Sequence, residues 1–312
     1  MFDLRQFPNG LAGVILSSGA TPTMTKTALI LGSSGKIGKH AAAAFARAGY
    51  EVRRHDRKTG DLMRDARGAT VIVNGWNPPA YHDWATLVPK MTEQVIAAAR
   101  VSSATVIIPG NVYNMDAEGG EWSESTVHRP PTRKGAIREA MERAYEASGV
   151  QTIVLRAGNF IDPKGQDDVM SLLFLRALKK NKLTLPGDAS ASQAYCYVPD
   201  WARAAVGLAE KKESLEWFED VPFPGHTFSA RQLQSRLEQE LGRPLKTTNF
   251  PWGLFVALAP FWELAREMVE MRYLFSLSHS LSGEKLAGLL PDFQVTPLEE
   301  VLRTSLRVAS AR

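Results

Sequence analysis

The chain has 312 residues, of which 44% are hydrophobic, and this is enough for one large domain or two closely packed ones. Its net charge is only +4 at pH 7 and it has no long basic run, which argues against a nucleic-acid partner. The single cysteine, Cys196, excludes an internal disulfide, and six scattered histidines argue against a metal site, so we expect a cytoplasmic protein.

The first 24 residues precede any regular pattern of strands and helices. The apolar run 11–16 is too short to span a bilayer. A nucleotide-binding pattern starts directly after Met24, where a protein could begin. We therefore expect residues 1–24 to be a disordered extension or a mis-assigned start, and not an export signal.

An apolar run at residues 27–31 leads into three glycines and then into an alanine-rich stretch that reaches Ala48. This order predicts a strand, a tight turn and a helix, with a second strand at residues 51–55. Glycine permits the turn, and the helix N-terminus presents free N–H groups to a phosphate. The motif predicts a dinucleotide site made of Gly32, Ser33, Ser34, Gly35, Lys36, Ile37 and Gly38.

The residues after the second strand bear on the type of cofactor. A carboxylate here, such as Asp56, suits the ribose hydroxyls of NAD, whereas a guanidinium such as Arg57 suits the additional phosphate of NADP. Arg54 and Lys58 add positive charge. The prediction therefore favours NADP and keeps NAD as the alternative.

Strand and helix patterns alternate to about residue 160. Short β-branched runs predict buried parallel strands at residues 70–74, 104–108 and 151–155. Longer stretches between them predict helices near residues 82–100 and 133–148. The fold class is therefore α/β, a Rossmann-type doubly wound parallel sheet that forms a dinucleotide-binding domain over residues 25–165.

We expect residues 166–312 to form a smaller, mostly helical C-terminal cap that binds the substrate. Within this range, residues 195–212 should return to the Rossmann core. Its helix signals are a run at 169–182, Asp200 as an N-cap, and capping boxes at Ser229–Gln232 and Thr296–Glu299. Charges and prolines interrupt the apolar stretch 250–275, so we expect a packed helical region or an interface and not a membrane span.

Several segments together resemble the extended short-chain dehydrogenase/reductase superfamily, in its epimerase/dehydratase group. They are the glycine motif and residues 60–62, 106–113, 155–163 and 197–202. Residues 77–81, 132–138 and 270–273 are similar to an atypical bacterial subgroup described only as NAD-dependent epimerases. The resemblance implies that Asp61 and Leu62 lie near the adenine and Asn74 beside the cofactor, and that the helices near 82–100 and 133–148 form a homodimer.

The resemblance breaks down at the catalytic positions. Where the superfamily has a Tyr, a Lys four residues later and a Ser, this chain has Lys134, Arg138 and Pro109. By resemblance Arg138 orients the cofactor ribose, and either Lys134 or Tyr113 handles the proton. We expect burial and the charge of Arg138 to favour a neutral Lys134 amine. An anion-binding Lys134 and a purely packing Tyr113 are the alternatives.

The same resemblance places the substrate beside four further residues, which are Trp76, Asn77, Tyr81 and Asn159. The predicted function is an NAD(P)-dependent oxidoreductase or epimerase-like enzyme that acts on a hydroxyl or carbonyl group of a small or sugar-nucleotide-like substrate. The alternative is a non-catalytic, redox-sensing or regulatory NAD(P)-binding protein, because the usual Tyr and Ser are replaced. The expected partners are the substrate and a second copy of the chain, with neither nucleic acid nor a membrane.

Overall fold

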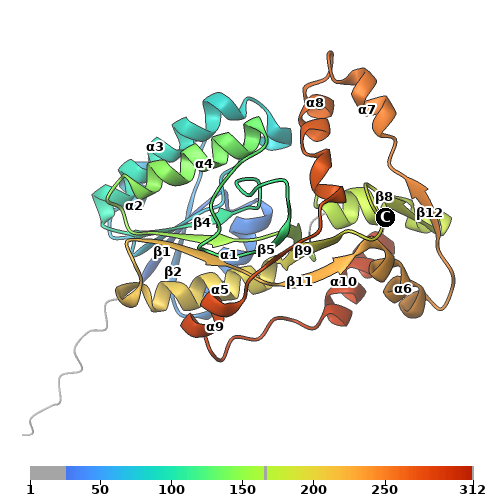
Figure 1. Cartoon of the computed structure of the whole chain (residues 1–312). Coiled ribbons are helices and arrows are strands. Elements are labelled where there is room, and N and C mark those ends of the chain that lie inside the picture. Colours follow the sequence, from blue (N-terminus) through green and yellow to red (C-terminus); the bar gives the residue numbers. More distant parts are fainter. Residues whose placement is uncertain (1–25, 165–166, 311–312) are drawn as a thin grey trace, which may run out of the picture.

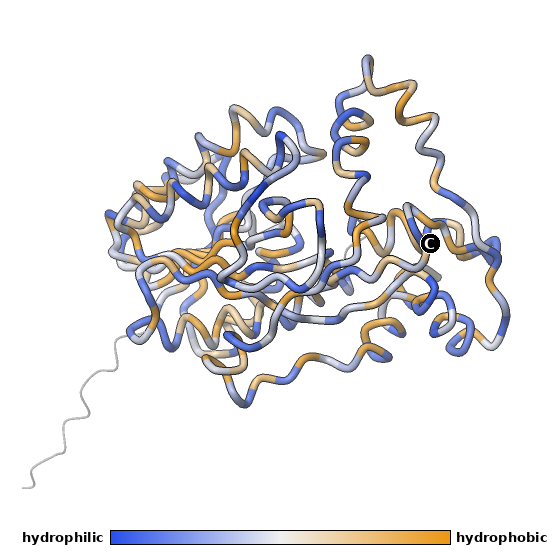
Figure 2. Tube along the Cα trace, viewed as in Figure 1, coloured by the Kyte–Doolittle hydropathy of each residue, from blue (hydrophilic) through white to orange (hydrophobic). Residues whose placement is uncertain are grey.

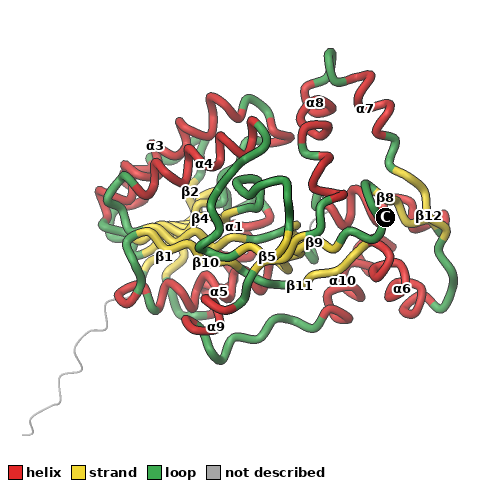
Figure 3. Tube along the Cα trace, viewed as in Figure 1, coloured by secondary structure: helices red, strands yellow, loops and turns green. Residues whose placement is uncertain are grey.

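The computed structural model describes residues 26–164 and 167–310, so the predicted extension at 1–24 lies outside it. A six-stranded parallel sheet forms its centre, in the order β10-β6-β4-β3-β1-β2 (Figure 3). Its strands are β1 (Thr27–Leu31), β2 (Glu51–His55), β3 (Val71–Asn74), β4 (Thr105–Gly110), β6 (Thr152–Arg156) and β10 (Phe218–Pro222). The predicted fold class is confirmed.

Helices cover both faces of this sheet, which is why its inner strands are buried and mostly apolar (Figure 1). One face packs against α1 (Lys36–Arg47) and α5 (Val198–Glu210). The other packs against α2 (Leu62–Ala66), α3 (Trp84–Ser102) and α4 (Arg133–Glu146). The order of the strands reverses between β1 and β3, and in such sheets ligands bind at this switch point.

Two predictions for the second half of the chain were wrong in detail. Residues 218–222, which we assigned to the cap, form β10 and complete the sheet beside β6. Asp200 does not cap α5, because Tyr197 occupies the N-cap position. Asp200 is buried in the first turn, where its carboxylate accepts hydrogen bonds from the backbone and hydroxyl of Thr296 at 2.7 and 2.8 Å.

The described residues also form small sheets, β7–β9–β11, β8–β12 and β5–β13, and the last of these pairs a strand of the first half of the chain with one near the C-terminus. Their strands are β5 (Gly120–Trp122), β7 (Asn159–Ile161), β8 (Lys182–Leu185), β9 (Ser192–Tyr197), β11 (His226–Ser229), β12 (Lys246–Asn249) and β13 (His279–Leu281). The helices are α6 (Ala230–Leu241), α7 (Trp252–Leu258), α8 (Glu263–Glu270), α9 (Glu284–Leu289) and α10 (Leu298–Ser310). The capping box of Ser229 and Gln232 is confirmed.

The run predicted as one helix at 169–182 is broken into two irregular turns, η2 (Met170–Phe174) and η3 (Leu175–Lys180), with a kink at Ala177. No helix among residues 26–164 and 167–310 is long and apolar enough to cross a membrane. The cap reaches the Rossmann domain through α8, which lies against the short turn η1 (Pro79–Tyr81) after β3.

Candidate active site

The loop between β1 and α1 forms a cradle for an anion. Gly32 has a φ of +68° and its carbonyl accepts a hydrogen bond from the Gly35 amide at 2.9 Å. A Cβ on Gly38 would lie only 2.2 Å from the Gly32 oxygen, so no other residue fits there without a shift of the backbone. No side chain caps α1 and its first turn has no acidic residue, which leaves the first N–H groups open to a phosphate. These features fit the pyrophosphate of a dinucleotide.

The side chains of this loop have different surroundings. Ile37 is buried in the core and offers the ligand only its backbone, whereas Ser33 is half-buried and Ser34 is exposed. Lys36 extends across the loop, and its ammonium donates to the Asp167 carbonyl at 2.9 Å.

The loop after β3 closes the other side of the cradle. A Cβ on Gly32 would lie 2.9 Å from the Gly75 oxygen, so the two loops touch through their backbones. Ala80, Tyr81 and Asp83 all have positive φ values, of 51°, 61° and 42°. Such angles cost about 1 kcal/mol or more each for residues other than glycine, and they concentrate at functional sites. This loop is thus held in a strained conformation at the switch point.

The predicted adenine-ribose residues lie after β2. The Asp56 carboxylate accepts hydrogen bonds from the Lys58 amide and the Thr59 hydroxyl, at 2.9 and 2.8 Å, and these bonds lower its pKa. The Arg57 guanidinium lies 6.0 Å from the centre of the Trp76 ring. Asp61 caps α2 by accepting from the Arg64 amide at 3.1 Å. Each acidic side chain therefore already has a partner within its own loop.

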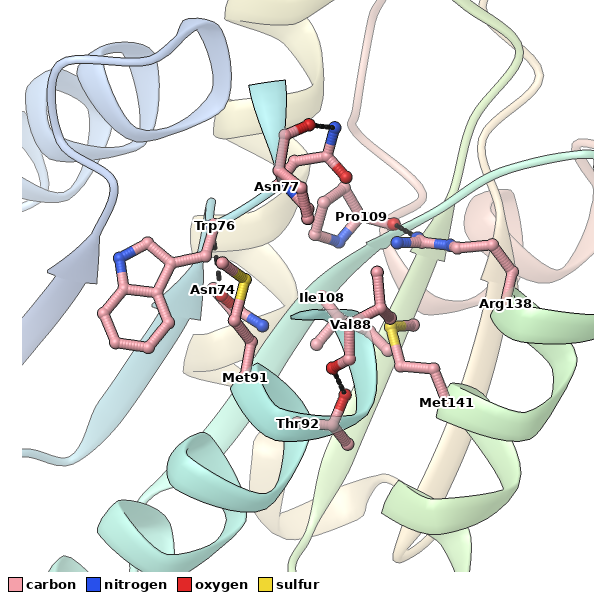
Figure 4. Close-up of a pocket in the computed structure, with 11 residues that line it drawn as sticks. Asn74, Trp76, Asn77, Val88, Met91, Thr92, Ile108, Pro109, Arg138 and Met141 are labelled. Carbon is pink, nitrogen blue, oxygen red and sulfur yellow. Dashed lines mark hydrogen bonds between the residues drawn. The ribbon is translucent and has the colours of Figure 1, made fainter. Parts of the chain in front are cut away.

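A small pocket opens between the carboxyl ends of β3 and β4 and the helices α3 and α4 (Figure 4). Asn74, Trp76 and Asn77 line it on one side. Asn74 is engaged at both ends, since its amide donates to the Tyr145 hydroxyl at 3.2 Å and its oxygen accepts from the Trp76 amide at 3.1 Å. Asn74 thus shapes the pocket, and its polar atoms are used within the protein.

Arg138 forms the polar wall of this pocket, as Figure 4 shows. The side chain is 7% exposed and donates to the Pro109 carbonyl. Its Nε is buried and has no hydrogen-bond partner among the described residues. Burial lowers the pKa of Arg138, while the nearby Glu142 opposes this. An unpartnered buried N–H is costly, so this donor fits a hydroxyl of a bound molecule.

Lys134 has partners that the sequence prediction missed. Its buried ammonium lies 2.5 Å from Glu267 and 2.6 Å from Glu270, and Glu270 also accepts from the Lys134 backbone amide at 2.9 Å. The sequence analysis considered only Arg138 beside this amine and missed the two carboxylates of α8 that pair with it. The cap is thus fastened to the first turn of α4.

Tyrosine hydroxyls gather next to this ion-pair network. The Tyr81 and Tyr113 oxygens lie 3.2 Å apart, and the Lys134 ammonium lies 5.3 Å from the centre of the Tyr81 ring. Burial raises the pKa of Tyr113, whereas the Tyr81 hydrogen bond and the charge of Arg138 oppose the rise. Tyr273 follows α8, and its buried hydroxyl has no partner among the residues that the structure describes.

Asn159 belongs to a separate polar pair under the cap. Its amide lies 3.3 Å from the Gln193 oxygen, and the Gln193 amide donates to the Leu274 carbonyl at 2.8 Å. The sequence analysis missed Gln193, Glu267 and Tyr273 as site residues. The motif 270–273 was the only signal, and it identified a resemblance without a role.

A cluster of one histidine and two carboxylates has the spacing of metal ligands, but the guanidinium of an arginine lies between the carboxylates. His128, Glu142 and Asp220 lie together, and the Arg156 guanidinium lies 2.6 Å from each carboxylate. Burial raises the pKa of Asp220 even beside this cation. We interpret the group as a buried ion-pair network.

The model of the NAD dependent epimerase/dehydratase family matches residues 90–221. The sequence matches no curated protein. Three solved structures are similar, each covering 91% of this chain and 99% of their own.

One of them is UDP-glucuronic acid 4-epimerase from Bacillus cereus in complex with UDP-glucuronic acid and NAD, at 16% identity and a TM-score of 0.73. Another is MoeE5 in complex with UDP-glucose and NAD, at 17% identity and a TM-score of 0.72. The third is L-threonine dehydrogenase from Phytophthora infestans, at 15% identity and a TM-score of 0.72. These likenesses show that the chain shares the fold of these proteins, and the family model matches residues in the same region of that fold.

Proposed function

We propose that this protein is an NAD(P)-dependent epimerase-like oxidoreductase that acts on a hydroxyl or carbonyl group of a small or sugar-nucleotide-like substrate. One juxtaposition supports this best. The anion cradle at Gly32–Gly38 and the Tyr81–Tyr113 hydroxyl pair lie on the two sides of the same loop after β3. A cofactor site and a group able to carry a proton therefore meet at one switch point.

The cofactor would lie along the carboxyl ends of β1 to β4. Backbone N–H groups of residues 32–38 would hold its pyrophosphate, and the free Nε of Arg138 would donate to a ribose hydroxyl. We propose NADP(H) as the preferred form, because Asp56 is engaged in its own turn while Arg57 faces the Trp76 ring with its charge unpaired among the described residues. When bound, the nicotinamide would accept or return a hydride.

The proton would be carried by Tyr113. Burial raises the pKa of Tyr113, but the hydrogen bond with Tyr81 and the charge of Arg138 offset part of this rise, as a cation does in the usual Tyr–Lys arrangement. Lys134 is a weaker candidate for this role, because its side-chain nitrogen is already paired with Glu267 and Glu270.

One observation favours the alternative of a regulatory NAD(P)-binding protein. The position that resembles the catalytic tyrosine is closed by a buried ion-pair network that joins the cap to α4. A protein of this kind would bind the cofactor tightly and transfer no hydride.

Cofactor binding is tested by calorimetry with NADPH and NADH on the wild type and on Gly35→Asp. The substitution adds a negative charge at the anion cradle, so we expect at least a tenfold loss of affinity. Arg57→Ala should weaken NADPH binding more than NADH binding, so that the ratio of the two affinities falls. Equal binding by the wild type and Gly35→Asp, or no binding by either, would refute the proposed cradle.

The proton carrier is tested by turnover of any hydride-transfer substrate found for the wild type. Tyr113→Phe removes only the hydroxyl, so we expect kcat to fall about 100-fold or more while cofactor affinity is kept. Lys134→Arg keeps the positive charge and should retain much of the turnover. A fully active Tyr113→Phe would reject the assignment, and cofactor binding without turnover on a panel of sugar nucleotides would favour the regulatory alternative.

A further inference from the structure

The helices α7 and α8 form a hairpin that projects beyond the rest of the molecule (Figure 1). Residues 250–262, which span α7 and the turn, include no charged side chain. Figure 2 shows the apolar character of this segment at the edge of the molecule. Exposed apolar side chains concentrate here, with Phe261 90%, Leu254 56%, Val256 50% and Trp262 43% exposed. We call residues 250–262 the apolar hairpin.

The apolar hairpin is held in place from within. The Phe255 ring lies 4.9 Å from Phe250 and 5.6 Å from Trp262, so one aromatic side chain joins the two arms. On the far side, Glu267 and Glu270 fasten α8 to Lys134. The exposed apolar side chains therefore point into solvent from a packed helical hairpin. Monomeric soluble proteins rarely expose such a group of apolar side chains unless it binds a partner or a membrane.

Basic residues surround the base of this hairpin. The Arg176 and Arg272 guanidinium groups lie 5.7 and 5.6 Å from the rings of Phe250 and Trp252. Lys182 on β8 lies directly opposite Lys246 on β12, and both are exposed. Like charges in this position repel each other unless an anion lies between them.

Within the part of the chain that the structure describes, these cations and their basic neighbours form no ion pair with a carboxylate. Among residues 26–164 and 167–310, no carboxylate lies within 4.0 Å of any member of the group, which consists of Arg176, Lys179, Lys180, Lys182, Lys246 and Arg272. We call these six residues the basic collar. It is a concentrated positive charge on a chain whose net charge is only +4.

We propose that the apolar hairpin and the basic collar dock the protein on an anionic lipid surface. Phenylalanine, tryptophan and leucine side chains at a projecting tip insert at the headgroup boundary, and adjacent Lys and Arg side chains bind anionic headgroups. No residue of the apolar hairpin carries a charged side chain, which suits insertion among lipids better than directional recognition of a protein partner. Docking of this kind lies on the membrane and does not span it, which revises our expectation from the sequence that a membrane is no partner.

The test is cosedimentation of the full chain with vesicles of phosphatidylcholine, with and without phosphatidylserine. We expect binding to the phosphatidylserine vesicles and a loss of at least about tenfold in affinity at high salt. The double variant Leu254→Asp/Phe261→Asp should lose at least about tenfold in affinity, as should the charge reversal Lys179→Glu/Lys182→Glu/Lys246→Glu. Each lysine near an anionic membrane surface raises the affinity for that membrane about fivefold.

Trp217→Asp is the matched control, because Trp217 is also 70% exposed but precedes β10, outside the hairpin. It should bind the vesicles as the wild type does. The hairpin variants should retain cofactor affinity, which shows that they fold. Absence of vesicle binding, or equal binding by the hairpin variant, would overturn the proposal. If instead the wild type is a dimer that Phe261→Asp dissociates, and no vesicles bind, a second copy of the chain covers the hairpin.

Discussion

Lys134 lies where the superfamily resemblance places a tyrosine, and its role is determined by what surrounds its ammonium group. Glu267 and Glu270 belong to α8 and lie more than 130 residues further along the chain. A buried ammonium is stable only beside such anions, and the two carboxylates equally require the cation. The replaced tyrosine thus leaves a position that ties the cap to the Rossmann domain.

This leads to a prediction about stability at the residue scale. Lys134→Met would remove the buried cation that Glu267 and Glu270 share, and Glu267 would keep only the half-exposed Arg133 and Arg266 as partners. We therefore expect the free energy of unfolding to fall by about 3 kcal/mol. Urea denaturation followed by circular dichroism measures it. Lys134→Met/Glu267→Gln/Glu270→Gln should recover part of the loss, because the unpaired charges are then removed. Unchanged stability in the single variant would contradict the ion-pair network as described.

At the scale of elements, α1 is connected to the loop after β7 through one carboxylate. The Asp162 side chain is buried, and it lies 2.8 Å from His40 and 2.6 Å from Lys39, both on α1. Burial alone would raise the pKa of Asp162, but the hydrogen bonds from His40 and Lys39 outweigh burial and hold it well below its usual value. Asp167, further along this segment, also contacts Lys36 of α1, so these contacts hold residues 162 and 167 beside the start of α1.

The depressed pKa of Asp162 predicts a pH dependence. A carboxyl with a lower pKa in the folded state stabilises the fold above its unfolded pKa of about 3.9, and this contribution is lost as the pH falls below that value. Asp162→Asn should therefore cost about 2 kcal/mol near neutral pH, and the difference from the wild type should shrink below about pH 4. Asp167→Asn, at an exposed side chain in the same loop, is the control. A difference that stays constant with pH would count against the Asp162 contacts.

At the scale of the whole molecule, the resemblance drawn from the sequence makes α3 and α4 the surface of a homodimer. Two alanines of α3, Ala98 and Ala99, are buried against the sheet and belong to the core. Ala97, Ala140 and Ala144 are exposed, so small side chains still allow a second pair of helices to approach closely.

We therefore retain the prediction of a homodimer through α3 and α4. Multi-angle light scattering at micromolar concentration should give twice the chain mass of 34.3 kDa. Ala140→Arg/Ala144→Arg should give the monomer mass, since two long charged side chains would prevent the helices from packing. Ala46→Arg, at an exposed position on α1, should leave the dimer intact. A monomeric wild type would refute the prediction.

The sequence by itself determined the features that depend on neighbours along the chain. The strand, glycine turn and helix at residues 27–47 follow from local backbone preferences and from periodicity, and so do the capping box at Ser229 and the buried strands. Only the tertiary structure decided that Glu267 and Glu270 reach Lys134, that Tyr81 meets Tyr113, and that β10 completes the sheet. The physical reason is that periodicity reports which face of an element is buried but not which distant element covers it. Pairing of buried charges is therefore set by the packing of segments far apart in the chain.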